Sequence, residues 1–188
     1  MSAAGFDADR YTIEQLIRPI ANLYKISTNG QSVAFVRQKK LAIKEDLRFF
    51  ADEGQTRELF RIKGRSVFEV RNTYDITDAM DGRIGALQKD FVTSIARSTW
   101  NVLDPTANVV ARVTEQNAIV AVVRRVVDLP IPFHFDIFGP DGGRVGELRR
   151  GFSMRDRYEL DLSGDPERSI DRRVAVALGV ALDALQSR

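Results

Sequence analysis

The residues with the clearest capacity for catalysis are a single histidine and an aspartate close to it. His134 is the one histidine of the chain, and Asp136 follows two residues later. Such a pair acts as a general base only beside a nucleophile and an oxyanion donor. The chain contains no Gly-x-Ser-x-Gly element or similar nucleophile motif. We therefore predict no catalytic residues, and we interpret His134 as a strand residue with a structural role.

Metal and cofactor sites are not expected either. The chain has no cysteine and one histidine, which is a poor ligand set for zinc. Residues 78–82 lack the ligand spacing of a calcium loop. Residues 139–146 are rich in glycine, but no helix follows them that could hold a phosphate. The recurrent aspartates fall at predicted hairpin corners, where turn chemistry accounts for them: Asp52, Asp78, Asp104 and Asp141.

A set of alternating cations is the strongest candidate for binding. Three of them alternate with apolar residues on one predicted strand and two on an earlier strand, so each group shares one face. On neighbouring strands they would form a cationic patch for phosphate or anionic lipid headgroups. The alternative is a solvated outer face neutralised by glutamates such as Glu45 and Glu58. The basic stripe consists of Arg37, Lys39, Arg61, Lys63 and Arg65.

An internal repeat predicts the elements that position these residues. Residues 82–89 recur as 143–150, and each copy has the pattern of a β-hairpin: a strand that opens on an aromatic residue, a polar turn and a return strand. Asn29-Gly30 is the strongest hairpin signal. Gly85 and Gly146 interrupt the alternation of their strands, which predicts a bulge or the close approach of another backbone. The leading aromatics are Tyr24, Phe50, Tyr74, Trp100, Phe135 and Tyr158.

Four segments depart from the repeat. Residues 117–132 are an insertion whose apolar spacing fits a helix, although its valines leave a strand open. Residues 11–19 fit either a short helix or a first strand. Residues 166–186 form a predicted helix with Asp165 as its cap, and it is apolar on every side between residues 174 and 182. Such a helix must be buried all round, so a sheet has to wrap around it. Residues 1–10 read as a flexible tail before a single domain, 11–188.

Composition narrows the function classes. The chain has 188 residues, 44% hydrophobic and 29% charged, as expected for one soluble domain. A net charge of +2 does not favour nucleic-acid binding. We find no secretory signal, and no apolar stretch approaches the roughly 20 residues of a membrane-spanning helix.

The ordered motifs resemble those of the tubby C-terminal-like superfamily, and most closely its branch of LURP-one-related proteins and phospholipid scramblases. The resemblance covers residues 16 to 185. It implies a closed antiparallel barrel of about twelve strands around a hydrophobic C-terminal helix. The cysteine cluster and calcium loop of animal scramblases are missing, whereas Lys63-Gly64-Arg65 matches a Lys-x-Arg pattern of phosphoinositide-binding tubby domains. The matching segments are residues 33–40, 59–63, 74–78 with Gly82, and 98–100.

The expected protein is thus a β-barrel with a buried helix, without catalytic residues, cofactor or metal. We expect it to be cytoplasmic, with the membrane periphery as an open location. The leading functional hypothesis is a scramblase-like or LURP-one-related barrel that binds anionic lipid or phosphate headgroups through the basic stripe. The alternative is a structural or protein-interaction module without a small ligand. The sequence leaves the oligomeric state open.

Overall fold

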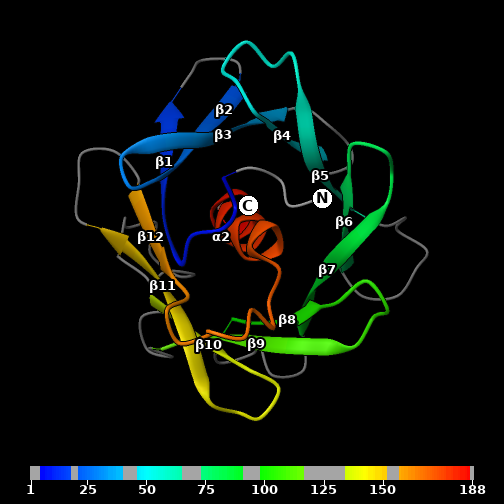
Figure 1. The fold of residues 1–188 in the computed structure, drawn as a ribbon, viewed down its shortest axis with the longest axis vertical. Helices are drawn as coiled ribbons and strands as arrows, with labels where there is room; N and C mark the ends of the chain where they lie inside the picture. The colour runs from blue at the N-terminus through cyan, green and yellow to red at the C-terminus, as the bar shows by residue number, and fades with distance from the viewer. Residues whose placement is uncertain are drawn as a thin grey trace.

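Twelve antiparallel strands close into a barrel around one helix (Figure 1). The computed structural model describes residues 5–17, 21–39, 46–64, 73–90, 98–116, 134–151 and 157–186. This architecture confirms the predicted fold class, a closed barrel of about twelve strands. The elements are β1 (Arg10–Ile17), β2 (Ala21–Thr28), β3 (Gln31–Lys39), β4 (Asp46–Phe50), β5 (Glu58–Gly64), β6 (Thr73–Asp78), β7 (Arg83–Asp90), β8 (Thr99–Leu103), β9 (Val109–Glu115), β10 (His134–Phe138), β11 (Arg144–Gly151), β12 (Arg157–Asp161) and α2 (Arg172–Gln186).

Each strand pairs with its neighbours along the chain, and β1 pairs with β12 to close the barrel. The repeat copies correspond to five hairpins: β2–β3, β4–β5, β6–β7, β8–β9 and β10–β11. The sixth copy provides β12, whose partner is the first strand. The segment that the sequence left undecided, residues 11–19, thus contributes most of β1. The predicted insertion at residues 117–132 lies outside the described residues.

The five hairpins share a β-bulge at the same place. In each return strand the pairing register shifts by one residue close to the turn. A bulge places an extra residue in one strand and increases its local twist and bend, as closure of a barrel requires. The bulge that Gly85 and Gly146 predicted is confirmed in both copies. The skipped residues are all apolar: Val33, Leu59, Ile84, Val110 and Val145.

The glycines beside two of these bulges allow neighbouring strands to approach closely. A Cβ atom added to Gly85 would lie 2.6 Å from the carbonyl oxygen of Leu103, on β8. A Cβ atom on Gly146 would likewise collide with the carbonyl oxygen of Asp161, on β12. The repeat therefore has glycine at these positions because backbone atoms occupy the space of a side chain.

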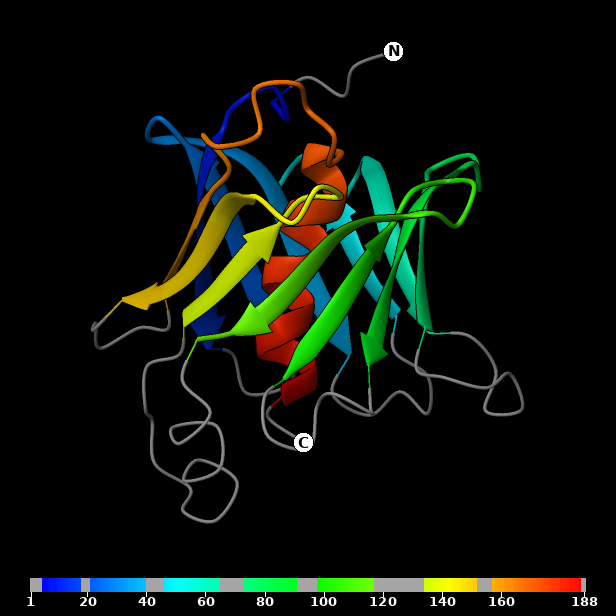
Figure 2. The same cartoon turned by 90° about the horizontal axis from the view of Figure 1, so that it is seen from below.

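Helix α2 runs along the barrel axis and fills the lumen (Figure 2). Its start lies at the end of the barrel where the hairpin turns are, which we call the turn end. Valine, alanine and leucine between Val174 and Leu182 are at most 2% exposed, because strands surround the helix on every side. Gly179 has its Cα against the side chain of Ile13, where a Cβ atom would collide. Among the described residues, no helix has both the length and the hydropathy needed to span a membrane.

The helix begins at Arg172, six residues after the predicted start at Pro166. Arg168 has a φ of 55°, in the left-handed region, so residues 166–171 cannot continue as a right-handed helix. The cap is Asp171, whose Oδ1 accepts the backbone N–H of Arg173 at 2.8 Å. Asp165, the predicted cap, instead accepts the backbone N–H groups of Ser169 and Ile170 in the turn before the helix.

The N-terminal residues before β1 contact the core. Phe6 is 5% exposed, and its ring meets that of Phe60 edge-on at 5.5 Å. Its ring also lies 6.2 Å from that of Tyr11. Burial raises the pKa of the Tyr11 hydroxyl to about 12. Residues 5–9, which the sequence placed in a flexible tail, therefore cover the turn end of the barrel.

One carboxylate enters the barrel near the other end of the helix. Asp183 accepts hydrogen bonds from the hydroxyl groups of Tyr24, at 2.7 Å, and Tyr158. Burial, followed by the nearby Asp183 charge, raises the pKa of Tyr24 far above its ordinary value. The Tyr24 hydroxyl thus stays protonated, and the two hydroxyls donate to the aspartate, which satisfies a polar group inside an apolar lumen.

Candidate functional site

The described side chains of the basic stripe, those of Arg37, Arg61 and Lys63, lie on the outer face of β3 and β5, with β4 between these strands. Arg37 on β3 pairs in register with Arg48 on β4, and Arg48 pairs with Arg61 on β5. These three arginines form a row across the sheet. The predicted patch required the strands of Arg37 and Arg61 to be neighbours, whereas β4, with Arg48, lies between them. Lys63 is exposed one pleat further along β5. Lys39 ends β3, and its side chain, like all of Arg65, lies outside the described residues.

Acidic side chains accompany this row of arginines. Arg48 pairs with Asp46 at 3.1 Å and with Glu58 at 3.5 Å. Arg61 pairs with the same Glu58 at 3.6 Å and with Asp81. Glu58 therefore takes the neutralising position that the alternative interpretation assigned to it, and the row carries little net charge. Glu45 lies outside the described residues.

Two cations of the stripe remain available to an outside ligand. Arg37 donates to the neutral side chain of Gln55 at 3.3 Å, and neither it nor Lys63 has an ion-pair partner among the described residues. Two exposed cations separated by a neutralised arginine form a weak electrostatic site in water.

The histidine–aspartate pair does not form a catalytic dyad. His134 is exposed on β10. The Asp136 carboxylate accepts instead from Gln116 at 2.9 Å and from Arg144 at 2.6 Å. The part of the chain that the structure describes contains no group of three side chains able to ligate a metal.

The turn aspartates accept hydrogen bonds from within their own hairpin turns, as predicted. Asp78 accepts from the backbone of Met80 and Gly82, and Asp141 accepts from Gly143. Asp104 accepts four bonds from Thr106 and Asn108. These bonds, led by that of the Thr106 hydroxyl, lower the pKa of Asp104 below its ordinary value, so Asp104 is charged at neutral pH.

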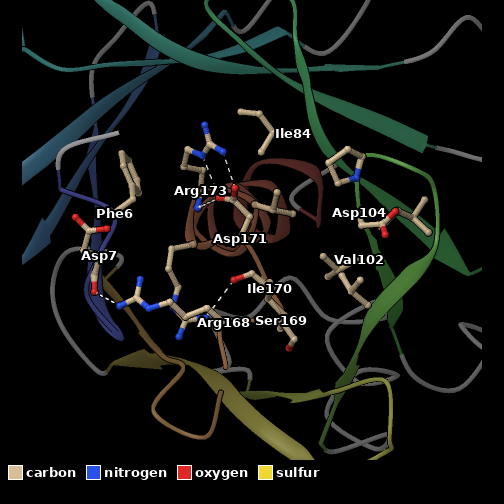
Figure 3. Close-up of a pocket in the computed structure, with 15 residues that line it drawn as sticks. Phe6, Asp7, Ile84, Val102, Asp104, Arg168, Ser169, Ile170, Asp171 and Arg173 are labelled. Carbon is tan, nitrogen blue, oxygen red and sulfur yellow. Dashed lines mark hydrogen bonds and ion pairs between the residues drawn. The ribbon is translucent and has the colours of Figure 1, made fainter. Parts of the chain in front are cut away.

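A cavity of about 380 Å³ lies at the turn end, across the start of α2 (Figure 3). Figure 3 shows Phe6 and Asp7 on one side of the helix start and Val102 and Asp104 on the other, with Asp171 between them. Its apolar walls come from two adjacent hairpins, from α2 and from the segment just before α2: Ile84, Val102, Leu103, Val110, Ile170 and Val174. Exposed residues at its rim are Asp7, Pro105, Arg168 and Ser169.

A buried ion pair fixes the wall that precedes the helix. Asp165 and Arg172 are each 3% exposed, and their Oδ2 and Nη1 atoms lie 2.6 Å apart. The Asp165 carboxylate also accepts the backbone N–H groups of Ser169 and Ile170. The other end of the Arg172 guanidinium donates to Asp9 at 2.8 Å, which ties the N-terminal segment to the helix. This network makes the cavity wall rigid.

The two other arginines of the cavity are also engaged. Arg173 donates from Nε and Nη2 to both oxygens of Asp171, at 3.0 and 2.6 Å. Arg168 donates to the backbone oxygen of Asp7. The positive end of the helix dipole therefore already faces a carboxylate of the chain itself. Asp104, by contrast, has no ion-pair partner in the described part of the chain.

The surroundings of the cavity are strongly acidic. The described connections at the turn end are residues 5–9, 29–30, 51–57, 79–82, 104–108, 139–143 and 162–171. With the first two residues of α2 included, because they line the cavity, the bases are Arg57, Arg168, Arg172 and Arg173. The acids are Asp7, Asp9, Asp52, Glu53, Asp81, Asp104, Asp141, Asp165, Glu167 and Asp171. The turn end thus has the opposite sign to the net charge of the whole chain, +2.

Sequence reasoning did not find this cavity. Its residues come from the N-terminal segment, two hairpins and the helix start, which are far apart in sequence. Two signals were present. Phe6 is the one aromatic residue among residues 1–10, and Asp165, Asp171 and Arg172 are closely spaced charges before an apolar helix. Only closure of the barrel brings them together.

The fold is an antiparallel barrel in chain order that its own C-terminal helix fills, as the resemblance to tubby-like proteins implied. The sequence model of the LURP-one-related family matches residues 32–183, and the chain belongs to this family. Comparisons with curated proteins and with solved structures give no significant match. Membership defines the barrel and assigns neither a ligand nor a reaction.

Proposed function

We propose that this LURP-one-related barrel is a non-catalytic binding module and that its ligand site is the cavity at the turn end. The observation that carries the proposal is the construction of the cavity: an apolar floor, a charged rim and walls fixed by the Asp165–Arg172 pair. A volume of about 380 Å³ lies within the range of small-ligand sites.

A small neutral probe tests this site without assuming the charge of the ligand. We would titrate cyclohexanol into ¹⁵N-labelled protein and into the variant Val110→Phe, whose larger side chain is expected to fill part of the cavity. Shifts of the Leu103 and Val174 amides in the wild type, lost in the variant, support the cavity. Equal shifts in both proteins, or none in either, contradict the proposal.

The second candidate function is the binding of anionic lipid or phosphate headgroups by the basic stripe: Arg37, Lys39, Arg61, Lys63 and Arg65. The observation that favours it is that Arg37 and Lys63 are exposed and form no ion pair among the described residues. This function requires a cytoplasmic protein at the membrane periphery.

Co-sedimentation with vesicles tests the second candidate. The variant Arg61→Ala/Lys63→Ala/Arg65→Ala should lose binding to vesicles that contain phosphatidylserine, and neutral vesicles should not bind either protein. Arg157→Ala, which removes an exposed cation from β12, is the matched control. Absence of binding at low salt, or unchanged binding by the triple variant, rules this function out.

A further inference from the structure

We propose that the cavity at the turn end receives an apolar side chain from a partner protein, in a segment that carries arginine or lysine on both sides of it. This inference rests on the proposed function, because it names the class of ligand for the same cavity. Two features carry it: the apolar floor of the cavity and the acidic surface around it.

The floor fits one aliphatic side chain. Ile84 and Leu103 are 5% and 8% exposed, and Val102 and Val174 are 1% and 2% exposed, so the floor consists of core residues of the barrel. Leucine or isoleucine placed there would exchange water for these side chains, which is the main source of affinity in such sites. Met80 and Val109, which are 88% and 49% exposed, extend apolar surface onto the same two hairpins.

The rim selects for positive charge. Asp104 is ionised, and its Oδ2 accepts a single bond, from Asn108 at 3.2 Å, so a lone pair remains for an outside donor. Arg173 is engaged by Asp171, and Arg172 by Asp165 and Asp9. Arg168 donates to the backbone oxygen of Asp7 and lies 4.0 Å from Asp9. An arriving carboxylate or phosphate would therefore compete with partners that the chain already supplies to all three arginines, whereas an arriving guanidinium would find carboxylate oxygen.

The whole turn end favours the same sign. Ten acidic residues against four basic ones, counted over its described connections and the first two residues of α2, repel an anionic membrane and attract a cationic segment. Charge complementarity therefore indicates a basic protein segment and not a phosphate or lipid headgroup.

Three synthetic peptides test the proposal. They are acetyl-Gly-Arg-Leu-Arg-Gly-amide and its analogues with both arginines replaced by glutamine or by glutamate. Binding would be measured by ¹⁵N chemical-shift titration in 50 mM and 500 mM salt. We expect the arginine peptide to bind best, the glutamine peptide less well and the glutamate peptide at least tenfold more weakly than the arginine peptide. The preference for arginine should shrink in high salt.

Three variants locate the interaction. Val110→Phe should weaken all peptides about tenfold, the value of one buried leucine side chain. Asp104→Asn should weaken the arginine peptide about two- to fivefold and leave the glutamine peptide unchanged. Asp141→Asn, which alters a similar turn aspartate away from the cavity, should change neither.

The outcomes separate this inference from the proposed function. If the arginine and glutamine peptides bind equally well, and Val110→Phe abolishes the binding of both, the preference for a basic segment is overturned and the cavity remains the binding site. Peptide binding that Val110→Phe does not alter overturns both. Phosphatidylserine vesicles that bind wild type but not Val110→Phe would assign the cavity to lipid and also overturn the inference.

Discussion

Replacing Asp165 by alanine should destabilise the protein more than any other single change at the turn end. The Asp165 carboxylate receives Ser169 Oγ at 2.7 Å, Arg172 Nη1 at 2.6 Å and two backbone N–H groups. Alanine removes all four bonds and leaves the Arg172 guanidinium, 3% exposed, with a positive charge in a water-poor site.

The expected loss follows from the partners that remain. Breaking a buried ion pair by removing one partner costs about 3–5 kcal/mol. Arg172 keeps Asp9 at 2.8 Å and the carbonyl oxygen of Ile170 at 3.1 Å, which places the loss near the lower end of that range, about 3 kcal/mol. For a domain of this size the melting temperature should fall by about 6–12 °C.

A double-mutant cycle in urea distinguishes this mechanism from simple loss of packing. Wild type, Asp165→Ala, Arg172→Met and the double variant would be compared. Since the double variant buries no unpaired charge, it should be more stable than Asp165→Ala alone. If Asp165→Ala lowers the free energy of unfolding by less than about 1 kcal/mol, or if the losses of the two single variants add up in the double variant, the unpaired charge of Arg172 is not the cause.

Three further predictions concern the core, the repeat and acid stability. Leu178→Asp puts a charge into the filled lumen, where Leu178 is 1% exposed, and should prevent folding; a soluble variant with an unchanged thermal transition would disprove the central helix. Gly85→Ala places a Cβ atom 2.6 Å from the Leu103 carbonyl oxygen and should cost about 1–3 kcal/mol in urea unfolding. Gly151→Ala, whose Cβ atom would lie 3.6 Å from the Arg157 carbonyl oxygen, should cost less, and the reverse order would contradict the proposed close approach. Burial raises the pKa of Asp165, but hydrogen bonds from Ser169, Arg172 and Ile170 outweigh this effect and lower the pKa overall. The group therefore stabilises the fold above its unfolded pKa of about 3.9, and this contribution is lost as the pH falls through the lower folded pKa. Urea midpoints between pH 7 and pH 2 should thus decrease less in Asp165→Ala than in wild type, and parallel curves would exclude the assignment.

The barrel was predictable because its signals are local and recur. An aromatic start, a turn such as Asn29-Gly30 and an apolar return strand identify each hairpin, and the bulge glycines 85 and 146 mark the same place in two of them. The apolar residues 174–182 then require a surrounding sheet. Closure follows from these facts, since a filled lumen needs a continuous wall.

The start of the helix and the N-terminal segment were less predictable, because tertiary contacts decide them. Asp165-Pro166-Glu167 has the composition of a helix start, yet the positive φ of Arg168 and the cap at Asp171 move that start to Arg172. Phe6 lies in a polar sequence, and its burial depends on Phe60, far along the chain.

The candidate site was the least predictable part, because it depends on which strands and ends meet. Alternation showed that the cations of the basic stripe share a face, but pairing with β4 brings Asp46 beside Lys63 and Arg48 between the predicted arginines. The cavity combines residues from both ends of the chain, and no local pattern encodes such a combination.

Chemical-shift mapping with acetyl-Gly-Arg-Leu-Arg-Gly-amide is the decisive experiment for a ligand site at the turn end. We expect the amides of Ile84, Leu103, Asp104 and Val174 to shift together, with one dissociation constant. Shifts confined to Arg37, Arg48 and Lys63 on the outer face, or no shifts at all, would contradict a binding site at the turn end of the barrel.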